Sequence, residues 1–304
     1  MKRLTITLTF ILTIFAFSAS AQNELFNKGL QQFDAKQYEQ AVETFKQVVT
    51  QTPNFYQAHF NMGLCYYNLG KYNEALTAFQ QSVSIKNDYA RAFYWQANSL
   101  SNLKRNTEAI NAYQKAIQYE PANANAHYRL GLVYQTEQKY PDAEKAFKKT
   151  LELAPSNEPA KTELGNVYVS QKMFPEAISL FNEILQLNPN SANAQLGLGN
   201  AYYNNNKWAE SIPYYKKAAE ITPTWATAQL YLADSYLNTK QYSLAIPTYQ
   251  KAISLDNKNA AAYYGLGLTY TNMKNKTSAQ MQYDKLKSLN AELAGRLLTR
   301  INAL

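Results

Sequence analysis

Two histidines and one cysteine are the first residues of this sequence to consider as metal ligands, as a base or as a nucleophile. His59 and His127 lie far apart along the chain, and Cys65 is the single cysteine. A metal site needs three or four ligands close together in space, and the two histidines occupy the same position of two repeat units that are not adjacent. We therefore expect both histidines to lie in the core and Cys65 to be a buried, unreactive thiol. The sequence predicts no metal site and no cofactor.

The sequence carries none of the motifs that mark common catalytic sites. It contains no nucleophile elbow, no phosphate-binding glycine loop, no zinc-ligand spacing and no kinase signature. We therefore expect a protein that is not an enzyme. The formal net charge is +8, but lysine clusters such as Lys148 with Lys149 lie close to acidic residues. This pattern predicts solvated helix faces and no nucleic-acid partner.

Arginines, aromatic residues and asparagines form a second group, which suits recognition. An arginine near tyrosine and tryptophan attracts acidic or aromatic groups. Asparagine both donates and accepts hydrogen bonds, so a series of asparagines could hold the backbone of an extended peptide whatever its sequence. The candidate ligand-groove residues are Arg91, Tyr94, Trp95, Asn98, Arg129, Asn166 and Asn200.

A repeat of 34 residues must position these side chains. Similar strings recur at multiples of that length: LGLVY begins at Leu130, LGNVY at Leu164, LGNAY at Leu198 and LGLTY at Leu266. Within each unit, positions 4, 7, 8 and 11 share one helical face and positions 20, 24 and 27 share another, which predicts two short amphipathic helices per unit. Eight units fit without a gap: residues 22–55, 56–89, 90–123, 124–157, 158–191, 192–225, 226–259 and 260–293.

Glycine recurs at position 8 of the units, although a glycine inside a helix lowers its stability by roughly 1 kcal/mol relative to alanine. We expect each of these glycines to let the two helices approach, so that the aromatic residue at position 24 fills the adjacent space. Gly197 lies at position 6, on a different face, where we expect it to leave room for the backbone of a ligand. Position 8 is occupied by Gly29, Gly63, Gly131, Gly165, Gly199 and Gly267.

The remaining recurrent positions carry a family resemblance. The fourth unit has Leu130, Gly131, Tyr134, Ala143, Phe147 and Pro155. These residues and their offsets resemble the consensus of the tetratricopeptide repeat. The resemblance implies an all-α fold, a right-handed superhelical solenoid of helix–turn–helix repeats. It also implies a concave groove that binds peptides or proteins, lined by positions 2, 5, 6, 9, 12 and 13 of each unit, where the candidate ligand-groove residues stand.

The two ends of the chain differ from the repeats. Residues 1–21 combine a basic start, an apolar run from Leu4 to Phe17 and an A-x-A arrangement ending at Ala21, which predicts a cleaved signal peptide. We therefore expect an exported protein, in the bacterial periplasm or outside the cell, with no integral membrane segment after cleavage. Residues 294–304 are predicted to form a C-terminal capping helix. Its apolar stripe, which would also suit binding to a membrane or a partner, consists of Leu293, Leu297, Ile301 and Leu304.

Three functions remain open from the sequence. The first, which we favour, is a non-enzymatic scaffold that binds an extended peptide segment of an envelope protein in its concave groove. The second is a glycan or cell-wall binding module, because aromatic and amide side chains also suit sugar rings. The third is a passive assembly subunit that contacts its partners through the convex face or the closing helix.

Overall fold

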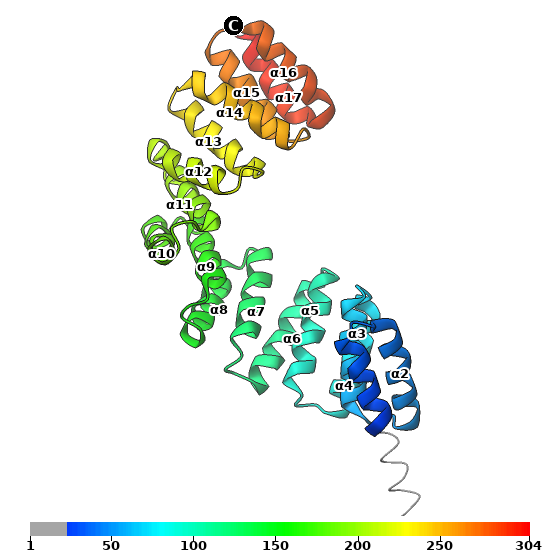
Figure 1. Cartoon of the computed structure of the whole chain (residues 1–304). Helices are drawn as coiled ribbons and strands as arrows, with labels where there is room; N and C mark the ends of the chain where they lie inside the picture. Colours follow the sequence, from blue (N-terminus) through cyan, green and yellow to red (C-terminus); the bar gives the residue numbers. More distant parts are fainter. Residues whose placement is uncertain (1–22) are drawn as a thin grey trace, which may run out of the picture. The chain divides into compact units, whose positions relative to one another are not determined.

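The computed structural model describes residues 23–304, so the predicted signal peptide, residues 1–21, lies outside the described residues. Every regular element in residues 23–304 is a helix (Figure 1). A helix of residues 23–34 comes first. The first helices of the following repeats are α3 (Tyr56–Asn68), α5 (Ala90–Asn102), α7 (Ala124–Thr136), α9 (Glu158–Ser170), α11 (Ala192–Asn204), α13 (Ala226–Asn238) and α15 (Ala260–Asn272). The second helices are α2 (Tyr38–Gln51), α4 (Tyr72–Ile85), α6 (Asn106–Tyr119), α8 (Tyr140–Leu153), α10 (Phe174–Leu187), α12 (Trp208–Ile221), α14 (Tyr242–Leu255) and α16 (Lys276–Leu289), and the chain ends with α17 (Ala291–Asn302).

The turn between paired helices has the same backbone conformation in every repeat. Its central residue has a positive φ, which terminates the first helix and reverses the chain. In the third repeat, for example, the Arg105 amide donates to the Leu100 carbonyl at 2.9 Å across Lys104, whose φ is 58°. The residues with positive φ are Lys36, Gly70, Lys104, Gln138, Lys172, Asn206, Lys240 and Lys274.

Glycine and aromatic residues pack between paired helices as the sequence predicts. A Cβ atom on Gly63 would lie 2.6 Å from the ring of Phe79, and one on Gly199 would lie 2.6 Å from the ring of Tyr215. The same relationship confirms the prediction for Gly29, Gly131 and Gly165. Gly267 is the exception, because its neighbour is Leu297 of α17 and not the aromatic residue of its own repeat.

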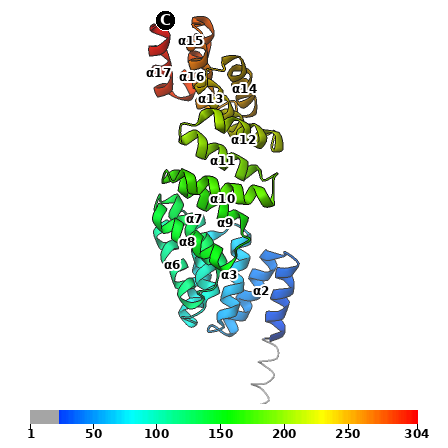
Figure 2. The same cartoon turned by 90° about the vertical axis from the view of Figure 1, so that its left-hand side faces the viewer.

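The contacts divide the chain into two compact units, an N-terminal unit that ends at Pro155 and a C-terminal unit that begins at Ser156. The N-terminal unit contains α2 to α8, and the C-terminal unit contains α9 to α17. Within each unit, consecutive helices pack side by side (Figures 1 and 2). Some first helices of neighbouring repeats within a unit also contact each other directly, such as α5 with α7 and α9 with α11.

The chain ends with a closing helix, as predicted. α17 packs against α15 and α16, and it buries Ala294, Leu297 and Ile301. It begins at Ala291, three residues before the predicted start. The prediction for Leu304 is wrong: this residue follows the end of the helix and is 48% exposed. None of the helices in residues 23–304 combines the length and apolar character that crossing a bilayer requires.

Candidate binding sites on the repeats

Two of the predicted groove residues, Asn98 and Arg129, lie together in a pocket of the N-terminal unit. The pocket has a volume of about 170 Å³. Its walls come from three successive first helices, α3, α5 and α7, and its floor includes Tyr113 of α6. We call it the N-terminal pocket, and its lining residues are Tyr67, Asn98, Ser101, Asn102, Tyr113, Arg129, Leu132, Val133 and Thr136.

The N-terminal pocket presents hydrogen-bond donors. Asn98 is buried, and its Oδ1 accepts a hydrogen bond of 2.7 Å from the Tyr113 hydroxyl, so its NH2 group is the part left for a ligand. Burial raises the pKa of Tyr113, and the positive charge of Arg129 acts in the opposite direction, which places that charge near the tyrosine. Within residues 23–304, Arg129 forms no ion pair. The arrangement suits an anionic ligand group.

An aromatic cluster borders the N-terminal pocket. Trp95 packs edge-on against Tyr67, with ring centroids 4.9 Å apart, and against Tyr94, with centroids 5.6 Å apart. Tyr94 also contacts Tyr113. All except Tyr113 are half-buried, so they offer apolar surface to a ligand. Tyr94 and Trp95 therefore belong with Asn98 and Arg129, as the sequence suggests.

Arg91 lies apart from the N-terminal pocket. Its guanidinium group lies over the ring of Phe60, 5.2 Å from the centroid. It precedes Asn98 by about two turns of α5, which is roughly 10 Å along the helix axis. Arg91 is exposed and, like Arg129, forms no ion pair within the described residues. It therefore extends the positive charge of this face without lining the pocket.

Asn166 and Asn200 lie in the C-terminal unit, where they line a second pocket of about 240 Å³. The Tyr215 hydroxyl donates to Oδ1 of Asn200 at 2.8 Å, which repeats the Asn98–Tyr113 arrangement three repeats later. Asn166 instead donates to Glu163 at 3.2 Å. We call this the C-terminal pocket, and its lining residues are Asn166, Val169, Ser170, Asn200, Tyr203, Asn204, Tyr215 and Tyr231.

The expected role of Gly197 is wrong. Gly197 is buried, and a Cβ atom there would overlap the ring of Phe181 in the preceding repeat. Gly265, at the same position two repeats later, faces Tyr249 in the same way. The glycine therefore makes room for a side chain of this protein and leaves none for a ligand.

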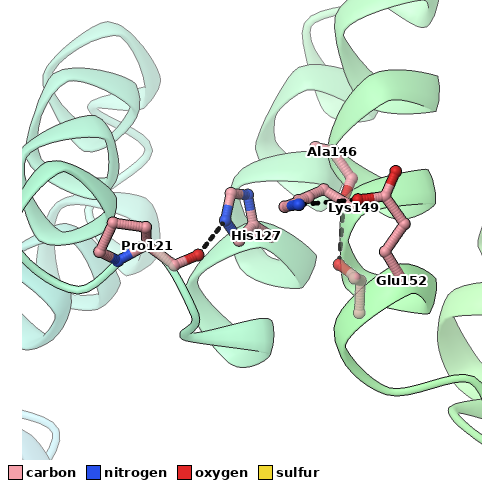
Figure 3. Close-up of polar contacts among 6 residues, drawn as sticks. Pro121, His127, Ala146, Lys149 and Glu152 are labelled. Carbon is pink, nitrogen blue, oxygen red and sulfur yellow. Dashed lines mark hydrogen bonds and ion pairs between the residues drawn. The ribbon is translucent and has the colours of Figure 1, made fainter.

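The histidines do not lie in the core, contrary to the prediction. Both are half-buried. Nε2 of His127 donates to the Pro121 carbonyl at 3.0 Å, and Nε2 of His59 donates to the Pro53 carbonyl at 2.8 Å (Figure 3 shows the first pair). Each histidine thus links the start of its own repeat to the end of the preceding one. Residues 23–304 contain no group of three His, Cys, Asp or Glu residues that could hold a metal ion.

A cleft between α6, α7 and α8 was not predicted from the sequence. Its volume is about 950 Å³, and its lining includes Ile117, His127 and Leu130. Its charged groups largely compensate one another: Lys149 pairs with Glu152 at 2.7 Å (Figure 3). Helical periodicity does not reveal it, because the lining comes from faces of three helices that the pattern assigns to packing or solvent.

Cys65 is fully buried, as predicted. Burial raises the pKa of its thiol to about 12. The thiol is therefore protonated at neutral pH, and the reactive thiolate form is rare.

Family models match the chain along most of its length. Models described as TPR repeat or tetratricopeptide repeat match residues 29–70, 56–89, 97–138, 124–157, 162–224, 233–274 and 260–293. The chain belongs to the tetratricopeptide repeat family. The resemblance drawn from the sequence is therefore confirmed, together with the all-α class and the helix–turn–helix repeats.

Several solved tetratricopeptide repeat structures are similar to this one. A tetratricopeptide repeat protein from Parabacteroides merdae has 22% identity and a TM-score of 0.63, over 82% of this chain and 99% of that one. PilF from Pseudomonas aeruginosa has 20% identity and a TM-score of 0.59, over 69% and 96%. The C-terminal part of a repeat-containing protein from Cytophaga hutchinsonii has 18% identity and a TM-score of 0.51, over 90% and 99%. No curated protein sequence matches the chain.

The family and the fold support a general role. Tetratricopeptide repeat proteins are generally non-enzymatic, and their stacked helix pairs present extended surfaces to other proteins. This chain accordingly has the architecture of a scaffold for protein–protein interactions.

Proposed function

We propose that the chain binds an extended peptide segment of a partner protein along its first helices, with an acidic side chain of the peptide in the N-terminal pocket. The observation that carries the proposal is the pairing of Arg129, which has no ion-pair partner among the described residues, with the NH2 group of Asn98 in one pocket. A guanidinium group binds a carboxylate through two parallel hydrogen bonds. An amide NH2 group beside it adds a further donor.

The aromatic cluster supports a peptide ligand. Tyr94 and Trp95 present half-buried rings next to the charged pocket. Aromatic and arginine side chains are the commonest anchors of protein interfaces, because they combine a large apolar area with few rotatable bonds. An acidic side chain flanked by an apolar one therefore matches this face better than a uniformly polar segment does.

A binding measurement on the full chain tests this proposal. The probes are fluorescein-labelled peptides of nine residues that contain either glutamate or glutamine between apolar residues. We expect the Arg129→Gln variant to bind the glutamate peptide at least about tenfold more weakly, which corresponds to about 1.4 kcal/mol. The matched control is Arg91→Gln, which removes a nearby positive charge outside the pocket.

The outcomes separate the three functions. Equal affinity for the glutamate and glutamine peptides, or no effect of Arg129→Gln, would contradict the acidic-peptide proposal. Binding to a glycan array without binding to either peptide would favour the cell-wall module. If association with partners is lost only when α17 is deleted, the closing helix is the contact surface.

We also infer that the partner lies in the cell envelope. The support is the sequence of residues 1–21, with its basic start, apolar run and A-x-A arrangement. N-terminal sequencing of the protein from fractionated cells checks this inference. We expect an envelope or secreted protein that begins at Gln22, whereas a cytosolic protein that begins at Met1 would exclude export.

A further inference from the structure

Asp234 takes a position that asparagine occupies in three other repeats, as Asn98, Asn166 and Asn200. In the third and sixth repeats, Asn98 and Asn200 accept a hydrogen bond from the tyrosine of the following second helix. In the seventh repeat, Asp234 accepts the equivalent bond from Tyr249. In each pair, the tyrosine follows the acceptor residue by 15 positions in the sequence. The seventh repeat therefore differs by one negative charge.

This negative charge has no cationic partner in the described residues. Asp234 forms no ion pair within residues 23–304. Burial raises the pKa of Tyr203, Tyr215 and Tyr249, and the charge of Asp234 raises all three further. Asp234 is therefore surrounded by tyrosines, which neutralise none of its charge.

Two of these tyrosines, Tyr203 and Tyr215, line one wall of the C-terminal pocket together with Tyr231. The rings of Tyr203, Tyr215 and Tyr231 contact one another pairwise, with centroid distances of 5.6 Å, 6.3 Å and 6.4 Å. Two of these side chains are held by hydrogen bonds: Asn238 donates to the Tyr203 hydroxyl at 3.1 Å, and Tyr215 donates to Asn200. The wall is thus fixed before any ligand binds.

Tyr231, Asp234 and Asn238 come from one face of α13, because residues three and four apart on a helix are neighbours. Asp234 therefore lies next to the aromatic wall and is close enough for its charge to raise the pKa of Tyr203 and Tyr215. Aromatic faces attract cations through their quadrupole, and a desolvated carboxylate attracts them through its charge. The two features favour the same kind of ligand.

We propose that the C-terminal pocket binds a cationic side chain, lysine or arginine, of a partner protein, with the charged head toward Asp234 and the apolar stem against Tyr203 and Tyr231. This inference rests on the proposal that peptides bind along the first helices. The C-terminal pocket then prefers a positive charge, whereas the N-terminal pocket, with Arg129, prefers an acidic side chain.

The hydrogen bond to the tyrosine does not require a charged acceptor, which argues that the charge of Asp234 serves a ligand. Asparagine provides the tyrosine with the same acceptor in the third and sixth repeats and carries no charge. A buried carboxylate without a cation lowers stability, and such uncompensated groups concentrate at functional sites. A bound ammonium or guanidinium group would supply the missing charge.

Binding of charged peptides to the full chain tests the proposal. The probes are fluorescein-labelled nonapeptides of alternating serine and arginine, and the same peptides with citrulline, an uncharged isostere, in place of arginine. We expect the arginine peptide to bind at least about tenfold more tightly than the citrulline peptide at pH 7.5. Asp234→Asn, which keeps the acceptor for Tyr249, should remove that difference, and Tyr231→Leu should reduce it.

Acidification gives a second measurement. Burial raises the pKa of Asp234 to about 6. The titratable groups that face it are Tyr203 on α11, Tyr215 on α12 and Tyr249 on α14, and burial raises the pKa of each, so none of them ionises near pH 6. Affinity for the arginine peptide should fall as the pH drops through 6, and the Asp234→Asn variant should show no such fall.

A charge-reversed control separates this proposal from the function proposed above. Arg129→Gln should weaken the glutamate peptide and leave the arginine peptide within about twofold, and Asp234→Asn should do the reverse. Equal binding of arginine and citrulline peptides, or an Asp234→Asn variant that binds arginine as the original chain does, would overturn the cation site. If the original chain binds the glutamate and glutamine peptides equally but still prefers arginine to citrulline, the acidic-peptide proposal is overturned and this one stands.

Discussion

The Tyr249 hydroxyl donates a hydrogen bond to the Asp234 carboxylate, at a position where the third and sixth repeats use an asparagine amide. The same hydrogen bond is therefore present in all three repeats, but its acceptor carries a negative charge only in the seventh. Because the scaffold accepts either residue, the effect of the charge on stability can be measured separately from the effect of the hydrogen bond.

Asp234→Asn should stabilise the protein at neutral pH. Burial raises the pKa of Asp234 from 3.8 to about 6, so the folded chain binds this proton more tightly than the unfolded chain does. The folded state therefore loses stability as the pH rises from about 4 through 6, by about 1–2 kcal/mol after allowance for partial exposure. Thermal unfolding followed by circular dichroism should show a higher Tm for the variant at pH 7.5 and an unchanged Tm at pH 4. A lower Tm at both values would mean that the carboxylate itself is structural.

Gly165→Ala should destabilise the C-terminal unit. The new methyl group would lie 2.6 Å from the Phe181 ring, which is fully buried between Gly165 and Gly197. Overpacking of this kind costs typically 1–3 kcal/mol. The matched control is Gly295→Ala in α17, where nothing lies within 4 Å of the new atom.

Because glycine disfavours helix, the Gly295→Ala control should be more stable than the original chain by roughly 0.5–1 kcal/mol. Urea unfolding of the two variants gives the comparison. If both variants are destabilised by a similar amount, contact with the Phe181 ring is not the cause of the effect at Gly165.

Lys172→Gly should stabilise the turn between α9 and α10. Lys172 has a φ of 60°, a conformation that strains residues with a Cβ atom by roughly 1–2 kcal/mol. Glycine removes this strain but loses more backbone entropy on folding, so the net gain should be about 0.5–1 kcal/mol. Lys172→Ala keeps the strain and should give no gain in Tm. If alanine stabilises as much as glycine, loss of the lysine charge is the cause.

Leu297→Ala should loosen the C-terminal end of the array. Leu297 is fully buried, packs against Gly267 and belongs to a cluster with Leu286 and Ile301. Loss of a buried leucine side chain costs about 2–5 kcal/mol. Hydrogen exchange should become faster in α15, α16 and α17 and stay unchanged in the N-terminal unit. Leu304→Ala, at a residue 48% exposed, should leave exchange unchanged in every helix.

Residues that interact within one repeat could be paired from the sequence. Gly63 and Phe79 stand at fixed positions of the same unit, so periodicity places them on facing helices, and the structure confirms their contact. The role of Gly197 could not be predicted in this way, because the ring that it accommodates, Phe181, belongs to the preceding repeat. The prediction that His127 lies in the core is wrong for the same reason, since its hydrogen-bond partner is the Pro121 carbonyl at the end of the preceding repeat.

The candidate site was predicted as a face and not as a pocket. Helical spacing places Tyr94, Trp95 and Asn98 on one side of α5, as observed. It does not show that Asn98 bonds to Tyr113, because that tyrosine comes from the second helix. Nor does spacing separate Arg91, which lies over Phe60, from the pocket that holds Arg129.

The sequence alone determined the family, the helix pairs and the closing helix, because apolar spacing within a short segment depends only on helix geometry. Tertiary structure decided which polar atoms are used internally and which face a ligand. Those assignments depend on the distance and angle between helices of neighbouring repeats, which arise from packing of large and small side chains across the interface. Asp234 illustrates the difference: its type is read from the sequence, but its tyrosine surroundings and the absence of an ion pair within residues 23–304 are visible only in the folded chain.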